Sequence, residues 1–239
     1  MYLLKCWRDT RSRFIFFLIV IAAVGVFSTI IDGPTDVQTR GVVHLWSDVA
    51  DVLGVYCSIL ALLAALSLAA PSIGQEFKEQ TLGFLLTRPR RRRYWIWTCW
   101  VVGACELGLV IFIAVVATFG TVSFVSGRVY TWRLLVATLP IFIGTVAVYS
   151  LTYLLTVLTR SSEQGINYGM GILVADLVLP IVGRYWHIHL SSVGSFILAG
   201  CEWTTSHNLA FPFGKLIIYA VVALAFPLAA QLVLERAEV

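Results

Sequence analysis

The sequence has few charged residues, and this scarcity indicates the class of protein. Only 13% of its 239 residues are Asp, Glu, Lys or Arg, whereas 59% are hydrophobic, and the mean hydropathy is +0.87. Soluble globular domains carry about 25% charged and about 45–50% apolar residues. The apolar residues also form long runs, and about 20 in succession are needed to cross a bilayer as a helix. We therefore expect an integral membrane protein rather than one or two soluble domains.

Motifs of catalysis are missing as well. The sequence has no Gly-x-x-x-x-Gly-Lys-[Ser/Thr] phosphate loop, and its Gly214-Lys215 pair is followed by Leu216. It has no His-Glu-x-x-His, and Ser195 with His207, the nearest approach to serine chemistry, lacks a Gly-x-Ser flank. We therefore expect neither ATP hydrolysis nor intramembrane proteolysis from this chain.

The cysteines and histidines form no familiar metal or disulfide pattern. The cysteines are Cys6, Cys57, Cys99, Cys105 and Cys201. Their number is odd, four lie in or near apolar segments, and none forms a Cys-x-x-Cys pair, so we expect packed small hydrophobic side chains. His187 and His189 form a His-x-His sequence, but its spacing to Cys201 and His207 matches no familiar zinc site. We expect no bound metal.

Six apolar segments are long enough to cross a bilayer. They cover about residues 14–31, 52–70, 94–124, 134–158, 166–181 and 216–234. The third is longer than a crossing needs and should tilt or project, whereas the fifth is short and contains Asp176 and Pro180. There is no internal repeat and no separate soluble segment. Residues 1–239 are therefore predicted to form one all-α transmembrane domain with six spans.

The distribution of Lys and Arg predicts the orientation, because cytoplasmic loops carry the excess of these residues. With the N-terminus inside, twelve cations fall on the inner side and five on the outer side. The inner set is Lys5, Arg8, Arg11, Arg13, Lys78, Arg88, Arg90, Arg91, Arg92, Arg93, Arg160 and Arg236; the outer set is Arg40, Arg128, Arg133, Arg184 and Lys215. We expect both termini to be cytoplasmic.

The segments outside the spans have distinct compositions. Residues 1–13 mix aromatic and aliphatic side chains with four cations, which is typical of a helix lying in the membrane interface. The outer segment of about residues 182–215 contains an apolar stretch, 190–198, that is too short to cross and suits a re-entrant or interfacial helix. The first outer loop carries Asp32, Asp36, Asp48 and Asp51, which form either a solvated rim or a surface that steers a cationic substrate.

A polar stretch, GQEFKEQTLGFLLTRPRRRR at residues 74–93, separates the second and third spans. We expect a helix that begins at Ser72 or Gly74, because acidic side chains crowd its first turns, where the helix dipole favours them. Apolar residues then recur at helical spacing, and the helix should end at Arg88 because proline follows. This predicts an amphipathic helix over about 74–88 on the cytoplasmic face. The cations Arg88, Arg90, Arg91, Arg92 and Arg93 would lie among anionic lipid headgroups, each contributing about 1 kcal/mol.

The pattern Glu76-x-x-x-x-Thr81-Leu82-x-x-Leu85-Leu86-x-x-Pro89-x-x-Arg92 resembles the cytoplasmic motif of type 2 ABC exporter permeases. The six-span layout, the interfacial N-terminus and the long last outer loop match that family coarsely over the whole chain. Two features depart from the family: Gln80 stands where glycine is common, and four arginines follow the proline instead of one or two. A basic loop that only obeys the positive-inside rule would explain the arginines but not the preceding amphipathic pattern.

The resemblance implies a coupling helix that docks on a cytoplasmic ABC ATPase. The residues that it assigns to ATPase coupling are Glu76, Phe77, Glu79, Thr81, Leu82, Leu85, Leu86 and Pro89. It also implies that ATP and Mg²⁺ bind to a partner subunit, and that a second permease copy or a related permease completes the transport path. The substrate would be lipid-like, drug-like or peptidic. No nucleic acid partner is expected.

Two carboxylates fall inside predicted spans, where ionisable groups are functional candidates. Glu106 lies in the third span and Asp176 in the fifth. Either they belong to the translocation path, or each is satisfied by a neighbouring helix or by nearby water. An alternative function follows from the first possibility, namely a nucleotide-independent carrier or channel that uses Glu106 and Asp176. An inverted repeat would support that alternative, and the sequence shows none.

Overall fold

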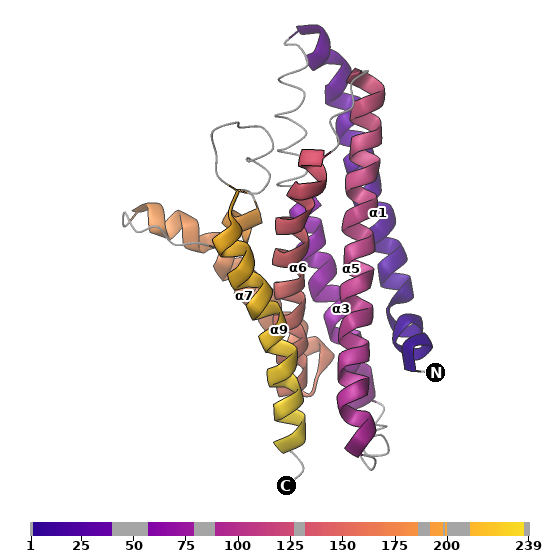
Figure 1. The fold of residues 1–239 in the computed structure, drawn as a ribbon, viewed down its shortest axis with the longest axis vertical. Coiled ribbons are helices and arrows are strands. Elements are labelled where there is room, and N and C mark those ends of the chain that lie inside the picture. The colour runs from indigo at the N-terminus through magenta and orange to yellow at the C-terminus, as the bar shows by residue number, and fades with distance from the viewer. Residues whose placement is uncertain are drawn as a thin grey trace.

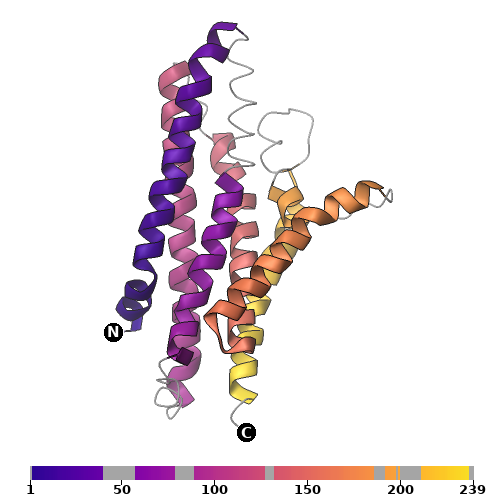
Figure 2. The same cartoon turned by 180° about the vertical axis from the view of Figure 1, so that it is seen from behind.

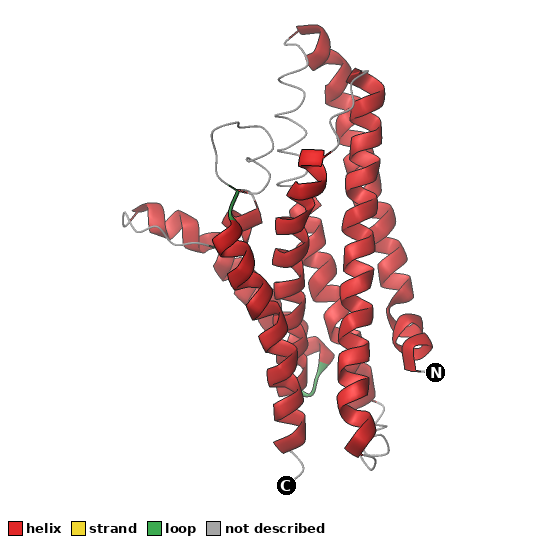
Figure 3. Cartoon of the chain, in the orientation of Figure 1, coloured by secondary structure: helices red, strands yellow, loops and turns green. Residues whose placement is uncertain are grey.

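The computed structural model describes residues 2–39, 57–78, 89–126, 132–185, 192–197, 199 and 211–236. Within these ranges the chain is helical apart from short turns and contains no strand (Figure 3). The prediction of an all-α chain is confirmed for these residues. It follows from long apolar runs whose backbone groups find their partners within the same helix.

The described residues form long helices that run alternately up and down (Figures 1 and 2). They are α1 (Tyr2–Thr39), α3 (Ser58–Lys78), α5 (Pro89–Ser126), α6 (Trp132–Thr159), α7 (Ser162–Tyr185) and α9 (Phe213–Arg236). A short helical stretch covers residues 193–197. Both termini lie toward the same end of the bundle, which we call the terminal end (Figure 1).

Three of the described helices contain a segment long and apolar enough to cross a membrane. These segments are Tyr94–Thr118 in α5, Thr138–Thr159 in α6 and Phe213–Arg236 in α9. The apolar part of α3, Ser58–Ala70, is shorter. The remaining predicted spans, at 14–31 and 166–181, fall within α1 and α7. The helices are compatible with a membrane protein, and each predicted span overlaps a different helix.

Helix α1 differs from its prediction. Instead of an interfacial helix followed by a separate span, residues Tyr2–Thr39 form one continuous helix, although its first turns bend (Figure 1). No proline or glycine occurs between Tyr2 and Val24 to end the helix early. Cys6 and Thr10, four residues apart on one face, are buried, and α1 packs along α5 and α3. The prediction of a separate N-terminal helix is therefore wrong, as is the start of the outer loop at Asp32, whereas the interfacial position of the first turns stays a prediction.

Helix α6 lies at the centre of the bundle and packs against α3, α5, α7 and α9. Its buried faces carry hydroxyl groups as well as apolar side chains. The hydroxyls of Thr145, Thr152 and Thr156 each donate to the carbonyl four residues earlier in the helix, so none of these three hydroxyls is left without a partner. These short side chains let α7 approach closely, because a Cβ at Gly169 would lie 2.8 Å from Thr152 Oγ1.

Helix α7 slants away from the rest of the bundle toward its C-terminal end (Figures 1 and 2). Its buried positions, Gly165, Gly169 and Leu173, form one narrow stripe at four-residue spacing. The large side chains beyond this stripe, including Ile172, Val174 and Leu177, are exposed. Helix α7 is thus held to the bundle mainly by its first half.

Candidate functional site

The predicted coupling segment joins α3 to α5. Helix α3 runs without interruption to Lys78, so Glu76 and Phe77 lie in its last turn and no new helix begins at Ser72 or Gly74. The other predicted coupling residues, Glu79, Thr81, Leu82, Leu85 and Leu86, and also Arg88, lie outside the described residues. Pro89 is the first residue of α5, a position that suits proline because its missing N–H would have no helical partner there. Arg90, Arg91, Arg92 and Arg93 follow within the helix.

The end of α3 contacts the turn between α6 and α7. Gly74 is buried there, and a Cβ added to it would lie 2.9 Å from Ser162 Cα. The turn itself is fixed by Arg160, which adopts a φ of 53°, and by Ser161, whose Oγ accepts a hydrogen bond from Gln164 N at 3.4 Å. The coupling segment therefore starts beside the turn between α6 and α7, at the terminal end of the bundle.

The N-terminal half of α5 is bonded to its neighbours α6 and α9. Trp97 Nε1 donates to Gln231 Oε1 of α9 at 3.0 Å, and Trp100 Nε1 donates to Ser150 Oγ of α6 at 2.8 Å. Tyr153 of α6 donates its hydroxyl to the Ile96 carbonyl at 3.0 Å. Indole and phenol groups need such partners when buried. The part of α5 that directly follows the coupling segment is thus firmly connected to two other helices.

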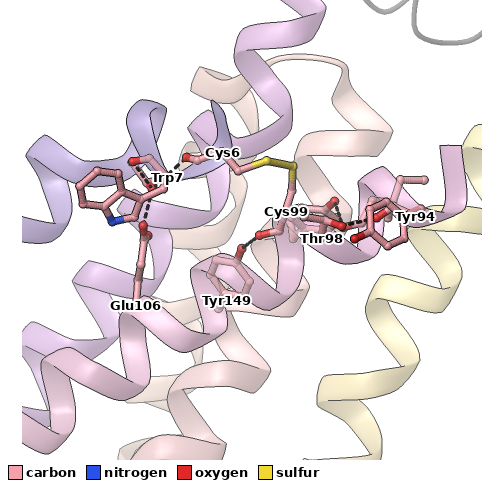
Figure 4. Close-up of a disulfide and its surroundings, with 10 residues drawn as sticks. Cys6, Trp7, Tyr94, Thr98, Cys99, Glu106 and Tyr149 are labelled. Carbon is pink, nitrogen blue, oxygen red and sulfur yellow. Dashed lines mark hydrogen bonds between the residues drawn. A yellow bond between two sulfur atoms is a disulfide. The ribbon is translucent and has the colours of Figure 1, made fainter. Parts of the chain in front are cut away.

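A disulfide and a hydrogen bond join α5 to α1. Cys6 and Cys99 form the disulfide, with their Cα atoms 5.7 Å apart (Figure 4). This corrects the expectation that both would be packed thiols; Cys57 and Cys105 are free. A few residues along each helix, Thr10 Oγ1 lies 2.6 Å from Glu106 Oε1. The pairing could not be read from the sequence, because it joins residues 93 positions apart.

Glu106 is buried between α5 and α1. Its side chain is 4% exposed and points toward the turn of α1 that carries Cys6 and Trp7 (Figure 4). Oε1 contacts Thr10, whereas Oε2 has no hydrogen-bond partner within the described part of the chain. A buried polar atom without a partner is uncommon and calls for an explanation.

Asp176 is held differently from Glu106. Its Oδ1 accepts a hydrogen bond from Val193 N at 3.1 Å, and its Oδ2 accepts one from Gly194 N at 3.3 Å. Ser192 and Ser195 add a reciprocal pair, in which each backbone N–H donates to the other hydroxyl at 2.9 Å. Asp176 therefore caps the N-terminus of the 193–197 helix, where a negative charge is favoured. The structure does not bring Asp176 together with Glu106.

Arg13 supplies a contact that the sequence reading missed. Its Nη1 donates to the Ser67 carbonyl of α3 at 2.9 Å. Four residues after Ser67 stands Pro71, which has no N–H and leaves that carbonyl without its helical donor. The proline signals the free carbonyl from sequence alone, but only the packing of α1 on α3 identifies its donor.

The other candidates remain apart from these contacts. No group of three metal-ligating side chains occurs among the described residues, and His187, His189, Cys201 and His207 lie outside them. Asp48 and Asp51 lie outside them too. The candidate site therefore consists of the predicted coupling segment and of the residues in the N-terminal half of α5 that are bonded to α1, α6 and α9.

No curated protein and no solved structure matches the chain. One family model matches residues 16–238, which is nearly the whole sequence, and its description is "Protein of unknown function (DUF2705)". The chain belongs to the DUF2705 family.

Proposed function

We propose that the chain is the membrane subunit of an ATP-driven exporter, similar to type 2 ABC permeases. It would move a lipid-like, drug-like or peptide substrate across the cytoplasmic membrane. ATP and Mg²⁺ would bind to a separate ATPase subunit, and a second copy or a related permease would complete the path. The observation that carries the proposal is the Glu76–Pro89 motif at the junction of α3 and α5.

The contacts around this junction support a coupling role. Motion of the segment would act directly on α5, whose first half is bonded to α1, α6 and α9. It would also act on the turn between α6 and α7 through Gly74 and Ser162. A docked ATPase at this end could therefore move the bundle by pushing on one short segment.

The proposed topology has six crossings and places the terminal end in the cytoplasm. Helix α5 has 38 residues and is about 57 Å long, so it exceeds the hydrocarbon thickness of about 30 Å and must project from it. Its four arginines would lie among anionic lipid headgroups on the cytoplasmic side.

Cross-linking during co-purification tests the partner. A photoactivated cross-linker attached to Gln80→Cys, in a Cys105→Ser background, should capture a Walker-motif ATPase in roughly equal amount to the chain. The matched control is Phe213→Cys, an exposed position at the start of α9, which lies at the opposite end of the bundle from the C-terminus (Figure 1). Capture from neither position, or equally from both, would contradict docking at the coupling segment.

Two variants test coupling. Leu82→Pro and Glu76→Gln should uncouple ATP hydrolysis from transport while the chain still accumulates folded in the membrane. Glu163→Gln is the control, because Glu163 is an exposed carboxylate in the first turn of α7 at the same end. Unchanged transport in the Leu82→Pro variant would rule out the coupling role.

A carrier independent of nucleotide is the second candidate, and the unpartnered Oε2 of Glu106 favours it. Asp176 adds less support, because both of its oxygens already accept backbone hydrogen bonds. For a proton-coupled carrier, Glu106→Gln should abolish transport driven by a proton gradient in vesicles without ATP. Transport that requires ATP and survives Glu106→Gln would exclude this candidate.

A further inference from the structure

We propose that Glu106 is a proton-binding site, in which the carboxyl group is a neutral acid bonded to Thr10 while α1 packs on α5, and gives up its proton when α1 moves away. The site does not depend on an ATPase partner. It concerns the junction between two helices and would exist in either kind of transporter.

The hydrogen bonds of Thr10 are the first reason. A hydroxyl has one hydrogen to donate, and Thr10 Oγ1 lies near three oxygens: Cys6 O at 3.1 Å, Trp7 O at 3.4 Å and Glu106 Oε1 at 2.6 Å. If Glu106 is protonated on Oε1, it donates to Thr10 Oγ1, and Thr10 donates in turn to the Cys6 carbonyl. Both hydrogens are then used, and both bonds join neutral groups.

The surroundings of the second oxygen are the other reason. Oε2 has no hydrogen-bond partner within the described residues, and Glu106 as a whole is more than nine-tenths buried. An ionised carboxylate in this position would keep at most one hydrogen bond for its charge, and an unpaired buried charge is far more costly than an unpaired carbonyl oxygen. The neutral acid leaves only a carbonyl oxygen without a partner.

The charged and titratable groups on the packed helices do not alter this conclusion. On α1, Arg8 and Arg11 are exposed, and Arg13 is exposed and donates to the Ser67 carbonyl. Lys5 and Asp9 are half-buried and each has an interaction of its own.

On α6, the hydroxyl of Tyr149 donates to the Cys99 carbonyl at 3.4 Å. On α9, Glu235 accepts from Gln231, which is bonded to Trp97 nearer the start of α5. On α3, Glu76 and Lys78 lie in the last turn of the helix, and Cys57, directly before the helix, is buried and free.

Asp176 provides an internal contrast. Each of its oxygens accepts a backbone N–H, which is the environment that stabilises an ionised carboxylate. The two carboxyl groups therefore have different surroundings: both oxygens of Asp176 accept backbone N–H groups, whereas only Oε1 of Glu106 has a partner among the described residues. Moving α1 away from α5 would remove Thr10 and admit water, and Glu106 would then ionise. The Cys6–Cys99 disulfide beside it keeps the two helices together and so hinders that release.

Infrared spectroscopy of the purified chain in lipid nanodiscs tests the proposal. At neutral pH, the wild-type chain should show the carbonyl-stretch band of a protonated carboxyl group. The band should vanish in Glu106→Gln, remain in Asp176→Asn, and shift in Thr10→Val, which removes the hydrogen-bond partner. A wild-type minus Glu106→Gln spectrum that contains only carboxylate bands at neutral pH would overturn the proposal.

Two further measurements cover other outcomes. If Glu106→Gln does not accumulate, the chain labelled with ¹³C-glutamate should still show a protonated carboxyl band that shifts in Thr10→Val; absence of any such band refutes the site.

Hydrogen exchange tests the release of the proton from Glu106. Transfer to D₂O should shift the band slowly in the wild type and several-fold faster in Cys6→Ser, with Cys105→Ser as control. Equal exchange rates in all three would refute the link to α1 movement.

Discussion

Helices α5 and α7 are held in the bundle in contrasting ways. The first half of α5 is tied by polar groups to three neighbours, through Trp97 to α9, Trp100 to α6 and Glu106 to α1. Helix α7 rests on a stripe of two glycines and a leucine, and its one described polar contact beyond them is Asp176. In a membrane, lipid would give helices little hydrophobic reason to associate, so close packing and hydrogen bonds would decide how firmly each is held. We infer that α5 is the more firmly held of the two helices and that the second half of α7 is the more easily displaced.

Overpacking α5 should give the largest effect. A Cβ at Gly103 would lie 2.6 Å from Tyr149 Cζ, and Tyr149 is fully buried and cannot move aside. We expect Gly103→Ala to reduce the free energy of unfolding by about 3 kcal/mol, as overpacked cores do. Thermal unfolding in detergent measures it. Gly171→Ala on α7 is the matched control, because nothing lies within 4 Å of that site, and it should cause no loss. Equal effects of the two variants would remove the distinction between the helices.

Removing the cap that Asp176 of α7 provides for the 193–197 helix should give an intermediate effect confined to that helix. Asp176→Ala deletes the acceptor for the N–H groups of Val193 and Gly194, at a cost of about 1–2 kcal/mol. Hydrogen exchange of these two amides should accelerate, while exchange in α5 stays unchanged. The control is Glu163→Ala, an exposed carboxylate on the same helix. Faster exchange throughout α5 would show that α7 is not the separable element.

The smallest effect should come from removing one hydrogen bond between α5 and α9. Gln231→Leu leaves Trp97 Nε1 without its acceptor and should destabilise the bundle by about 1 kcal/mol. Gln164→Leu, an exposed glutamine on α7, serves as control and should be near neutral. Thermal unfolding of both, compared with Gly103→Ala, ranks the α5 contacts. A larger loss of stability for Gln164→Leu than for Gln231→Leu would contradict the inference that α5 is held more firmly than α7.

The helices were predictable from sequence because hydropathy reports on local chain segments. The predicted span 134–158 differs from α6 by only a few residues at its start and one at its end. Contacts between distant segments were not predictable: Thr10 and Glu106 are 96 residues apart, and neither position carries a pattern that names the other. Continuity of α1 was missed because charge composition suggested an interface, whereas the unbroken helix depends on burial of Cys6 and Thr10 against α5. The roles of Glu79 to Leu86 stay predictions.

The bond from Arg13 to the Ser67 carbonyl bears on biogenesis. Arg13 precedes its acceptor by 54 residues in the chain, so α1 leaves the ribosome before Ser67 does. Until α3 emerges, the guanidinium must stay in water or among headgroups. Once α3 is in place, Arg13 donates to the Ser67 carbonyl, which Pro71 leaves without a helical donor. We expect the two helices to leave the insertion machinery as a pair, with α1 settling into place only after α3 has arrived.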